Sequence, residues 1–187
     1  MKKTENKKCL IVNLFGGPGT GKSTNAAALF YRLKMMGINC ELVTEFAKDI
    51  TWEKNRKALA CQPYVFGKQC YRIERCVDQV DVIITDSPLP LSILYNKDGN
   101  IEPYFSKMVV KKFNSYKNMN YLLESKHLYS NIGRNETAEE AQSINEELFQ
   151  LLNKFKIDYV SIPVNKDTVD ILVEDVAGQL GRLCINE

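Results

Sequence analysis

The feature that most constrains the fold is a glycine-rich turn between a short apolar run and a helix-forming segment. The apolar run is Cys9–Phe15, and the turn reads Gly16-Gly17-Pro18-Gly19-Thr20-Gly21-Lys22-Ser23. This turn fits the pattern G-x-x-x-x-G-K-[ST], in which glycines let successive backbone N–H groups point inward around anionic oxygens. Residues 22–35, which follow, are rich in Ala, Leu and Met and favour a helix. A buried strand, a glycine turn and a helix in this order predict a phosphate-binding loop.

Each residue type in this loop has a separate chemical purpose. We expect Lys22 to bridge the β- and γ-phosphates of a nucleotide and the Ser23 hydroxyl to bind Mg²⁺. The start of the following helix adds partial positive charge beside the phosphates. The expected cofactors are therefore ATP and Mg²⁺. The residues expected to bind the nucleotide are those of the loop and the first helical turn: Gly17, Pro18, Gly19, Thr20, Gly21, Lys22, Ser23 and Thr24.

Short apolar runs alternate with longer helical segments along the rest of the chain, which predicts a parallel sheet with helices on both faces. Strands are expected at 9–15, 39–44, 81–86, 119–123 and 158–162, and helices at 22–35, 64–79, 103–117, 138–155 and 168–183. Residues 45–61 are mixed and compatible with one short helix. The length of 187 residues suits a single domain over 1–187, with a small lid at about 127–140.

Charge and cysteine content narrow the classes of function. The formal net charge is only +2, so any binding of nucleic acid has to come from a local patch. The six cysteines show no C-x-x-C spacing, and we interpret all of them as reduced residues in or near the core of a cytoplasmic protein. The apolar run Cys9–Phe15 is too short to span a membrane. The single histidine, His127, has no cluster of cysteines or carboxylates near it in the sequence, so no metal role is expected for it.

Two carboxylates follow predicted strands at the edge where parallel α/β sheets bind ligands. Asp86 ends the strand at 81–86 and is expected to hold the Mg²⁺ shell, although a residue before Pro88 can also be a simple turn former. Glu45 follows the strand at 39–44 and is a candidate to accept the proton of an acceptor hydroxyl. The alternative for Glu45 is a surface carboxylate that pairs with Lys48, and Asp86 is the rival base.

Arg134 lies in a polar connection, directly after Gly133 and before a predicted helix start. A flexible arginine there is expected to close over ATP and offset charge in the transition state. The alternative is a solvated arginine that pairs with Glu136 or Glu139. Lys22, Glu45, Asp86 and Arg134 are therefore the candidate catalytic residues.

A basic stripe on the helix at 64–79 is the candidate acceptor-binding surface. Lys68, Arg72 and Arg75 recur at helical spacing with tyrosines beside them, a combination that can bind an acceptor phosphate or stack on a base. Such a stripe is also typical of a solvated helix face. Trp52 could line an acceptor pocket or pack at the edge of the core.

Three stretches carry a family resemblance: Asn13–Thr24, Leu42–Asp49 and Asp81–Pro88. They resemble phage-encoded small P-loop kinases, a group related to the ribosylnicotinamide kinase domain that includes the 5-hydroxymethyluracil DNA kinases. The resemblance covers most of residues 9–165 and implies phosphorylation of a hydroxyl on a nucleoside-like group. It also implies acceptor, metal and lid roles for Glu45, Asp86 and Arg134. Where an arginine is expected near 124–126, this chain has Lys126.

These observations together predict an α/β P-loop NTPase with an adenylate-kinase-like, five-stranded parallel sheet flanked by helices. The predicted function is a Mg-ATP-dependent kinase whose acceptor is 5-hydroxymethyluracil in phage DNA, acting in the host cytoplasm. Two alternatives stay open. One is a kinase of a free nucleoside, nucleotide or ribosylnicotinamide, and the other is a P-loop ATPase that acts as a switch or assembly factor. No membrane partner is expected, and the oligomeric state is not predicted.

Overall fold

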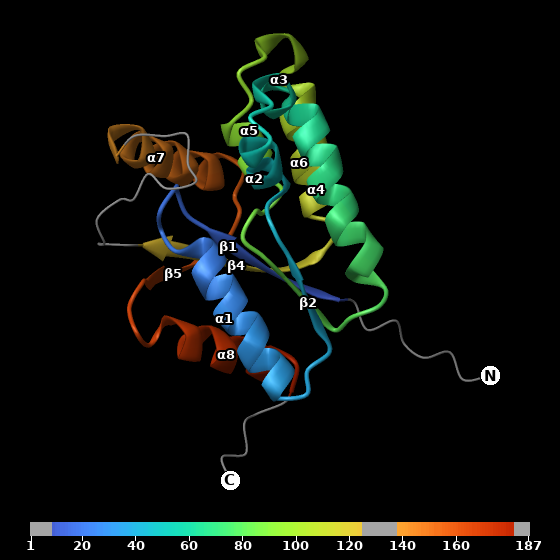
Figure 1. The fold of residues 1–187 in the computed structure, drawn as a ribbon, viewed down its shortest axis with the longest axis vertical. Coiled ribbons are helices and arrows are strands. Elements are labelled where there is room, and N and C mark those ends of the chain that lie inside the picture. The colour runs from blue at the N-terminus through green and yellow to red at the C-terminus, as the bar shows by residue number, and fades with distance from the viewer. Residues whose placement is uncertain (1–8, 125–137, 182–187) are drawn as a thin grey trace, which may run out of the picture.

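The structure is a computed structural model that describes residues 9–124 and 138–181 (Figure 1). Five parallel strands form one sheet in the order β2-β3-β1-β4-β5. This sheet, with helices on both sides, confirms the predicted α/β class. The strands are β1 (Leu10–Phe15), β2 (Cys40–Val43), β3 (Val82–Thr85), β4 (Lys117–Glu124) and β5 (Val160–Pro163).

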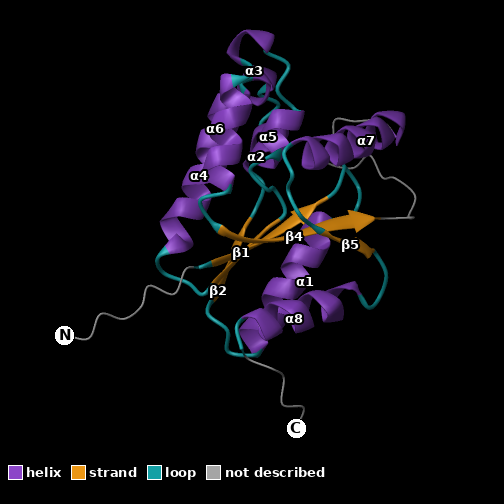
Figure 2. Cartoon of the chain, turned by 180° about the vertical axis from the view of Figure 1, so that it is seen from behind, coloured by secondary structure: helices purple, strands orange, loops and turns teal. Residues whose placement is uncertain are grey.

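Helices cover both faces of this sheet, as Figures 1 and 2 show from opposite sides. One face is covered by α1 (Lys22–Met35) and α8 (Thr168–Gln179), and the other by α4 (Gln62–Val77), α6 (Tyr104–Phe113) and α7 (Ala138–Lys154). All residues of β1 are buried, because successive side chains of a central parallel strand enter cores on opposite faces. Leu10, Val12 and Leu14 belong to the core with α1 and α8, whereas Ile11 and Phe15 belong to the other core.

The structure differs from the predicted elements mainly between β2 and β3. Residues 45–61 form two short helices, α2 (Phe46–Trp52) and α3 (Arg56–Ala60), instead of one. Asn55 separates them, because its side chain caps α3 by accepting a hydrogen bond from Ala58 N at 3.1 Å. Helix α4 begins earlier than predicted, at Gln62, with Pro63 in its first turn, a position that suits proline. A further short helix, α5 (Leu91–Leu94), follows β3.

The chain after α6 also differs from the prediction. Helix α6 ends at Phe113, before the predicted end at 117, and β4 begins at Lys117. The reason is pairing with β1, whose first residue, Leu10, is in register with Lys117. None of the helices within the described residues is long and apolar enough to cross a bilayer.

The sheet order brings three candidate segments to one edge. Strand β3 pairs with β1 through Thr85 and Asn13, and with β2 through Thr85 and Val43. All three strands run in the same direction, so their carboxyl ends meet. The glycine loop follows β1, Asp86 follows β3, and Glu45 comes two residues after β2. The fold therefore gathers the predicted phosphate, metal and base residues in one region.

Candidate active site

The glycine loop between β1 and α1 forms a compact turn closed by its own lysine. Gly21, the residue before α1, has a φ of 86°, a left-handed conformation that glycine adopts without strain. The Lys22 ammonium donates hydrogen bonds to the carbonyl oxygens of Gly16 and Gly17, both at 2.8 Å. The Thr20 hydroxyl also donates to Gly17 O, at 2.9 Å. Lys22 therefore lies across the loop, where an incoming phosphate would compete with these carbonyls.

A side chain from α7 holds the loop from the outside. The backbone N–H of Gly17 donates to Asn145 Oδ1 at 2.8 Å. A Cβ atom at position 17 would lie 2.5 Å from that oxygen, so this approach requires glycine. The sequence did not point to Asn145, because nothing in a polar helical segment marks the residue that meets a loop so far away in the chain. The contact makes Asn145 part of the phosphate site's support.

Asp86 provides the test of whether a metal fits this site. Its side chain is only 4% exposed, and Oδ1 has no hydrogen-bond partner among the described residues. A buried carboxylate oxygen without a donor destabilises the protein unless a cation neutralises its charge or a water donates a hydrogen bond to it. The Ser23 hydroxyl, at the start of α1, is exposed. These two residues fit a Mg²⁺ ion that shares its ligands with nucleotide phosphates and water, as Mg²⁺ sites usually do. The described residues contain no group of three His, Cys, Asp or Glu that could hold a metal unaided.

Glu45 is the residue before α2, and its neighbours on both sides are held by one buried side chain. Gln69 of α4 accepts a hydrogen bond from Phe46 N at 2.9 Å and donates one to Thr44 O at 3.3 Å. The same amide nitrogen lies 3.5 Å from the Thr85 hydroxyl, one residue before Asp86. Gln69, which the sequence analysis missed, therefore links the segments that carry the two carboxylates.

The structure does not bring the predicted acceptor stripe into the candidate site. Arg72 donates to Thr44 O at 3.2 Å, forms an ion pair with Asp49, and lies 5.1 Å from the ring centroid of Phe46. Lys68 lies over the Tyr64 ring at 5.7 Å, and Arg75 is exposed. Arg72 thus joins α4 to the chain around Glu45. Trp52 is 63% exposed and, like these three residues, does not line the cavity described next.

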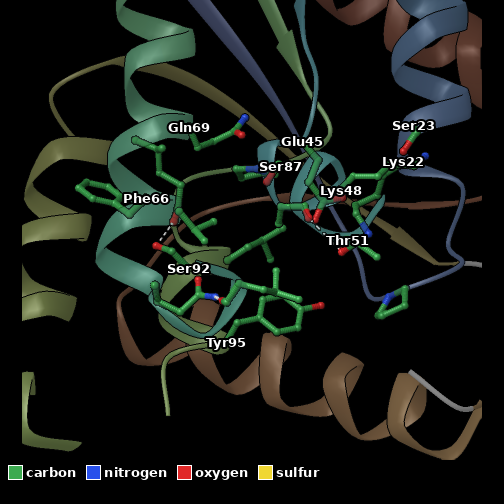
Figure 3. A pocket seen from close by; sticks show the side chains of 18 of the residues that line it. Lys22, Ser23, Glu45, Lys48, Thr51, Phe66, Gln69, Ser87, Ser92 and Tyr95 are labelled. Atoms are coloured by element: carbon green, nitrogen blue, oxygen red, sulfur yellow. Dashed lines mark hydrogen bonds between the residues drawn. The ribbon is translucent and has the colours of Figure 1, made fainter. Parts of the chain in front are cut away.

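A cavity of about 490 Å³ extends from the glycine loop to the short helices that follow β2 and β3. Figure 3 shows Lys22 and Ser23 at one side of this cavity, Phe66 at the other side, and Glu45 between them. Asp86 itself is not part of the lining, which on that segment begins at Ser87. Polar residues line the cavity together with an apolar group, which comprises Leu59, Val65, Phe66, Leu89, Leu91 and Tyr95. The cavity thus joins a phosphate-binding end to an end suited to an organic group.

The comparison with known families agrees with this geometry. The family model of an AAA domain matches residues 11–169, from β1 into the first turn of α8. The chain belongs to this AAA domain family. This AAA domain is accordingly a nucleotide-binding P-loop NTPase domain, a class that binds nucleotides together with Mg²⁺. No curated protein matches the sequence significantly.

Some expectations fall outside the part of this AAA domain that the structure describes. Arg134, His127 and the predicted lid up to residue 137 belong to the segment 125–137, which is not described. The cysteine interpretation needs one correction. The described cysteines are free thiols, and burial raises the pKa of Cys9 to about 11, but Cys61 is exposed rather than near the core. Cys61 ends up on the surface because it lies in the short link between α3 and α4.

Proposed function

We propose that this AAA domain is a Mg-ATP-dependent kinase that transfers the γ-phosphoryl group to a hydroxyl of a nucleoside-type acceptor. The supporting observation is the cavity, which continues from the glycine loop into a wall that includes Phe66 and Tyr95. Water as the nucleophile would need no such compartment, whereas an organic acceptor must be bound and oriented next to the γ-phosphate. A volume of about 490 Å³ is in the range of small-molecule sites.

The specific acceptor that we propose is 5-hydroxymethyluracil in phage DNA, which places the reaction in the host cytoplasm. The resemblance of the three sequence stretches to phage-encoded kinases supports this acceptor. The target base would have to be single-stranded or flipped out of the duplex, because a base that is stacked inside a duplex cannot enter the cavity. A free nucleoside, nucleotide or ribosylnicotinamide is the alternative acceptor for the same chemistry.

The residues have the following roles in the proposed reaction. The acceptor hydroxyl oxygen bonds to the γ-phosphorus while the bond from that phosphorus to the β–γ bridging oxygen breaks, and ADP leaves with the electron pair. Glu45 accepts the hydroxyl proton, with Asp86 as the rival base. Lys22 leaves the loop carbonyls for the phosphates. For Arg134, whose segment the structure does not describe, we keep the sequence-based expectation that it closes over the phosphates. Ser23 and Asp86 would hold Mg²⁺, which would offset the negative charge of the phosphates.

A second candidate is favoured by the family match. AAA is a name for NTPase domains, so the chain could hydrolyse ATP as a switch or assembly factor and use no organic acceptor. In that case Glu45 would orient water, and the apolar wall would bind something other than a substrate.

An acceptor panel tests the proposal against this candidate. The protein is incubated with Mg-ATP and, in turn, a 5-hydroxymethyluracil oligonucleotide, the matching nucleoside and ribosylnicotinamide, and each acceptor is then weighed by mass spectrometry. We expect the oligonucleotide to gain one phosphoryl group. An oligonucleotide with thymine in place of 5-hydroxymethyluracil is the matched control and should stay unmodified. Release of phosphate at one rate with every acceptor, and no modified product, would favour the switch instead.

A further inference from the structure

Two basic side chains in the cavity have no assigned role in the proposed reaction. Lys48 of α2 and Arg56 of α3 both line the cavity, and both side chains are exposed. Neither forms an ion pair with any residue that the structure describes. The alternative expectation that Lys48 pairs with Glu45 is therefore not supported. Glu45 is the only acidic residue among the described ones that line this cavity.

The positive charge of these side chains is additional to that of the phosphate loop. Lys22 is the basic residue of the loop itself and is expected to meet the nucleotide phosphates. Helices α2 and α3 lie on the same side of the sheet as α4, and both ribbon views place α3 farther from the sheet than α2 (Figures 1 and 2). Arg56 is therefore carried by the helix that lies farther from the sheet. A group recognised by Arg56 belongs to the second ligand rather than to ATP.

We propose that the acceptor carries a phosphate of its own, which Arg56 and Lys48 bind, so that a nucleotide or nucleic-acid strand is preferred over a neutral nucleoside. This inference rests on the proposed kinase function. An arginine can hold two phosphate oxygens at once, and a lysine adds a compact charge beside it. The apolar residues Phe66 and Tyr95 would receive the base, and Glu45 lies between Phe66 and the glycine loop, where the acceptor hydroxyl has to be.

The predicted basic stripe on α4 is less suited to bind the acceptor phosphate. Arg72 already contacts Thr44 and Asp49, and neither Lys68 nor Arg75 lines the cavity. A phosphate bound at that stripe would lie outside the compartment that contains Glu45. The binding site for the acceptor phosphate is therefore assigned to α2 and α3. These helices lie in residues 45–61, where the sequence pattern predicted the secondary structure least clearly.

The experiment uses three acceptors with the same 5-hydroxymethyluracil base: the nucleoside, its 5′-monophosphate and a short single-stranded oligonucleotide. KM and kcat for each acceptor are measured with the wild-type protein, Lys48→Gln and Arg56→Gln. Lys57→Gln is the matched control, since Lys57 is the exposed neighbour of Arg56 on α3 and does not line the cavity. We expect Arg56→Gln to raise KM for the phosphate-bearing acceptors about tenfold or more, because a charge-assisted hydrogen bond is lost. KM for the nucleoside should stay unchanged, and Lys57→Gln should match the wild type for all three.

The arms of the experiment also separate the two phosphate sources. Use of the monophosphate but not of the oligonucleotide assigns a free nucleotide, and use of the oligonucleotide with activity that falls as salt rises assigns a nucleic-acid strand. Equal use of the nucleoside and the monophosphate, with no effect of Arg56→Gln, would overturn the inference.

Equilibrium binding distinguishes failure of the inference from failure of the kinase proposal. Binding of the same three compounds is measured by calorimetry while a non-hydrolysable ATP analogue fills the glycine loop. The monophosphate can bind to the wild-type protein, bind more weakly to Arg56→Gln, and yet receive no phosphoryl group. That result contradicts the kinase function but not the phosphate site. Equal binding of the monophosphate by the wild-type protein and Arg56→Gln contradicts the phosphate site.

Discussion

The Gln69 side-chain oxygen accepts a hydrogen bond at 2.9 Å from the backbone N–H of Phe46, the residue directly after Glu45. On the other side of Glu45, the Gln69 amide donates to Thr44 O, and it also reaches the Thr85 hydroxyl. Gln69 is only 4% exposed, so these contacts are made in a part of the protein that excludes most water. One side chain of α4 therefore sets the spacing between the segments that carry Glu45 and Asp86.

Replacing Gln69 should impair chemistry more than nucleotide binding. We expect Gln69→Ala to lower kcat by about a hundredfold, the typical effect of a reacting group displaced by about 1 Å, with KM for ATP nearly unchanged. The variant should also lose about 1–3 kcal/mol of unfolding free energy, because buried backbone groups lose their partner. Steady-state kinetics and denaturant unfolding measure both effects. Gln79→Ala, an exposed glutamine beyond α4, is the control, and a fall in kcat that only tracks the folded fraction would refute the positioning role.

The contact between Asn145 and Gly17 should affect nucleotide affinity. We expect Asn145→Ala to raise KM for ATP about tenfold, because the loop loses a hydrogen bond that holds its shape. Gly17→Ala should be worse, since the new Cβ would lie 2.5 Å from Asn145 Oδ1. In the double variant Gly17→Ala/Asn145→Ala the clash is removed, so the second change should cost less than it does alone. Strictly additive effects in this double-mutant cycle, measured by ATP titration, would argue against a direct contact.

Asp86 should govern the metal dependence of the reaction. Its Oδ1 has no hydrogen-bond partner among the described residues, so it is suited to bind Mg²⁺ directly or to accept a hydrogen bond from a water bound to Mg²⁺. We expect Asp86→Asn to raise the Mg²⁺ concentration for half-maximal turnover more than tenfold, while nucleotide binding in the presence of EDTA is not weakened. Turnover is followed across a Mg²⁺ titration at fixed ATP. An unchanged Mg²⁺ midpoint together with a lower kcat would instead identify Asp86 as the base.

Glu74, away from the active site, gives a pH-dependent prediction. The ammonium of Lys112 and the hydroxyl of Tyr116 both donate to its carboxylate and hold the pKa of Glu74 below its ordinary value of 4.5. A carboxyl group with a lowered pKa stabilises the fold above its unfolded pKa, and this contribution is lost as the pH falls through the folded value. The wild-type protein should therefore have a higher Tm than Glu74→Gln at pH 7. The difference should shrink as the pH is lowered from 5 to 3, and a constant difference over that range would contradict this assignment.

The site residues that can be predicted from the sequence are those that belong to local motifs or follow strand ends. The glycine loop needs a fixed spacing, and Asp86 and Glu45 follow apolar runs, so their meeting at one sheet edge follows from parallel pairing. Gln69 and Asn145 act through contacts between distant segments, and no local pattern marks them. Helical spacing predicts correctly that Arg72 shares a face with Lys68 and Arg75, but it does not show that this face meets the chain around Thr44.

A second group of candidate functional residues, Lys48 and Arg56, lies in residues 45–61, whose mixed composition gave no clear prediction. Periodicity did not resolve α2 and α3, because each is too short to display a full apolar stripe. Lys48 and Arg56 could therefore be recognised as candidate ligand-binding residues only from the structure, in which both line the cavity. The family match agrees with the nucleotide-binding class that the glycine loop predicts.

The most direct measurement of the central claim is the fate of the γ-phosphoryl group in a single turnover. The protein is mixed with γ-labelled Mg-ATP and a 5-hydroxymethyluracil oligonucleotide, and the label is divided into acceptor-bound and free phosphate. The kinase account predicts that most of the label enters the oligonucleotide and that Lys22→Ala, with an unchanged circular dichroism spectrum, abolishes the transfer. Label found only as free phosphate, at a rate that no nucleoside-type acceptor changes, would contradict it.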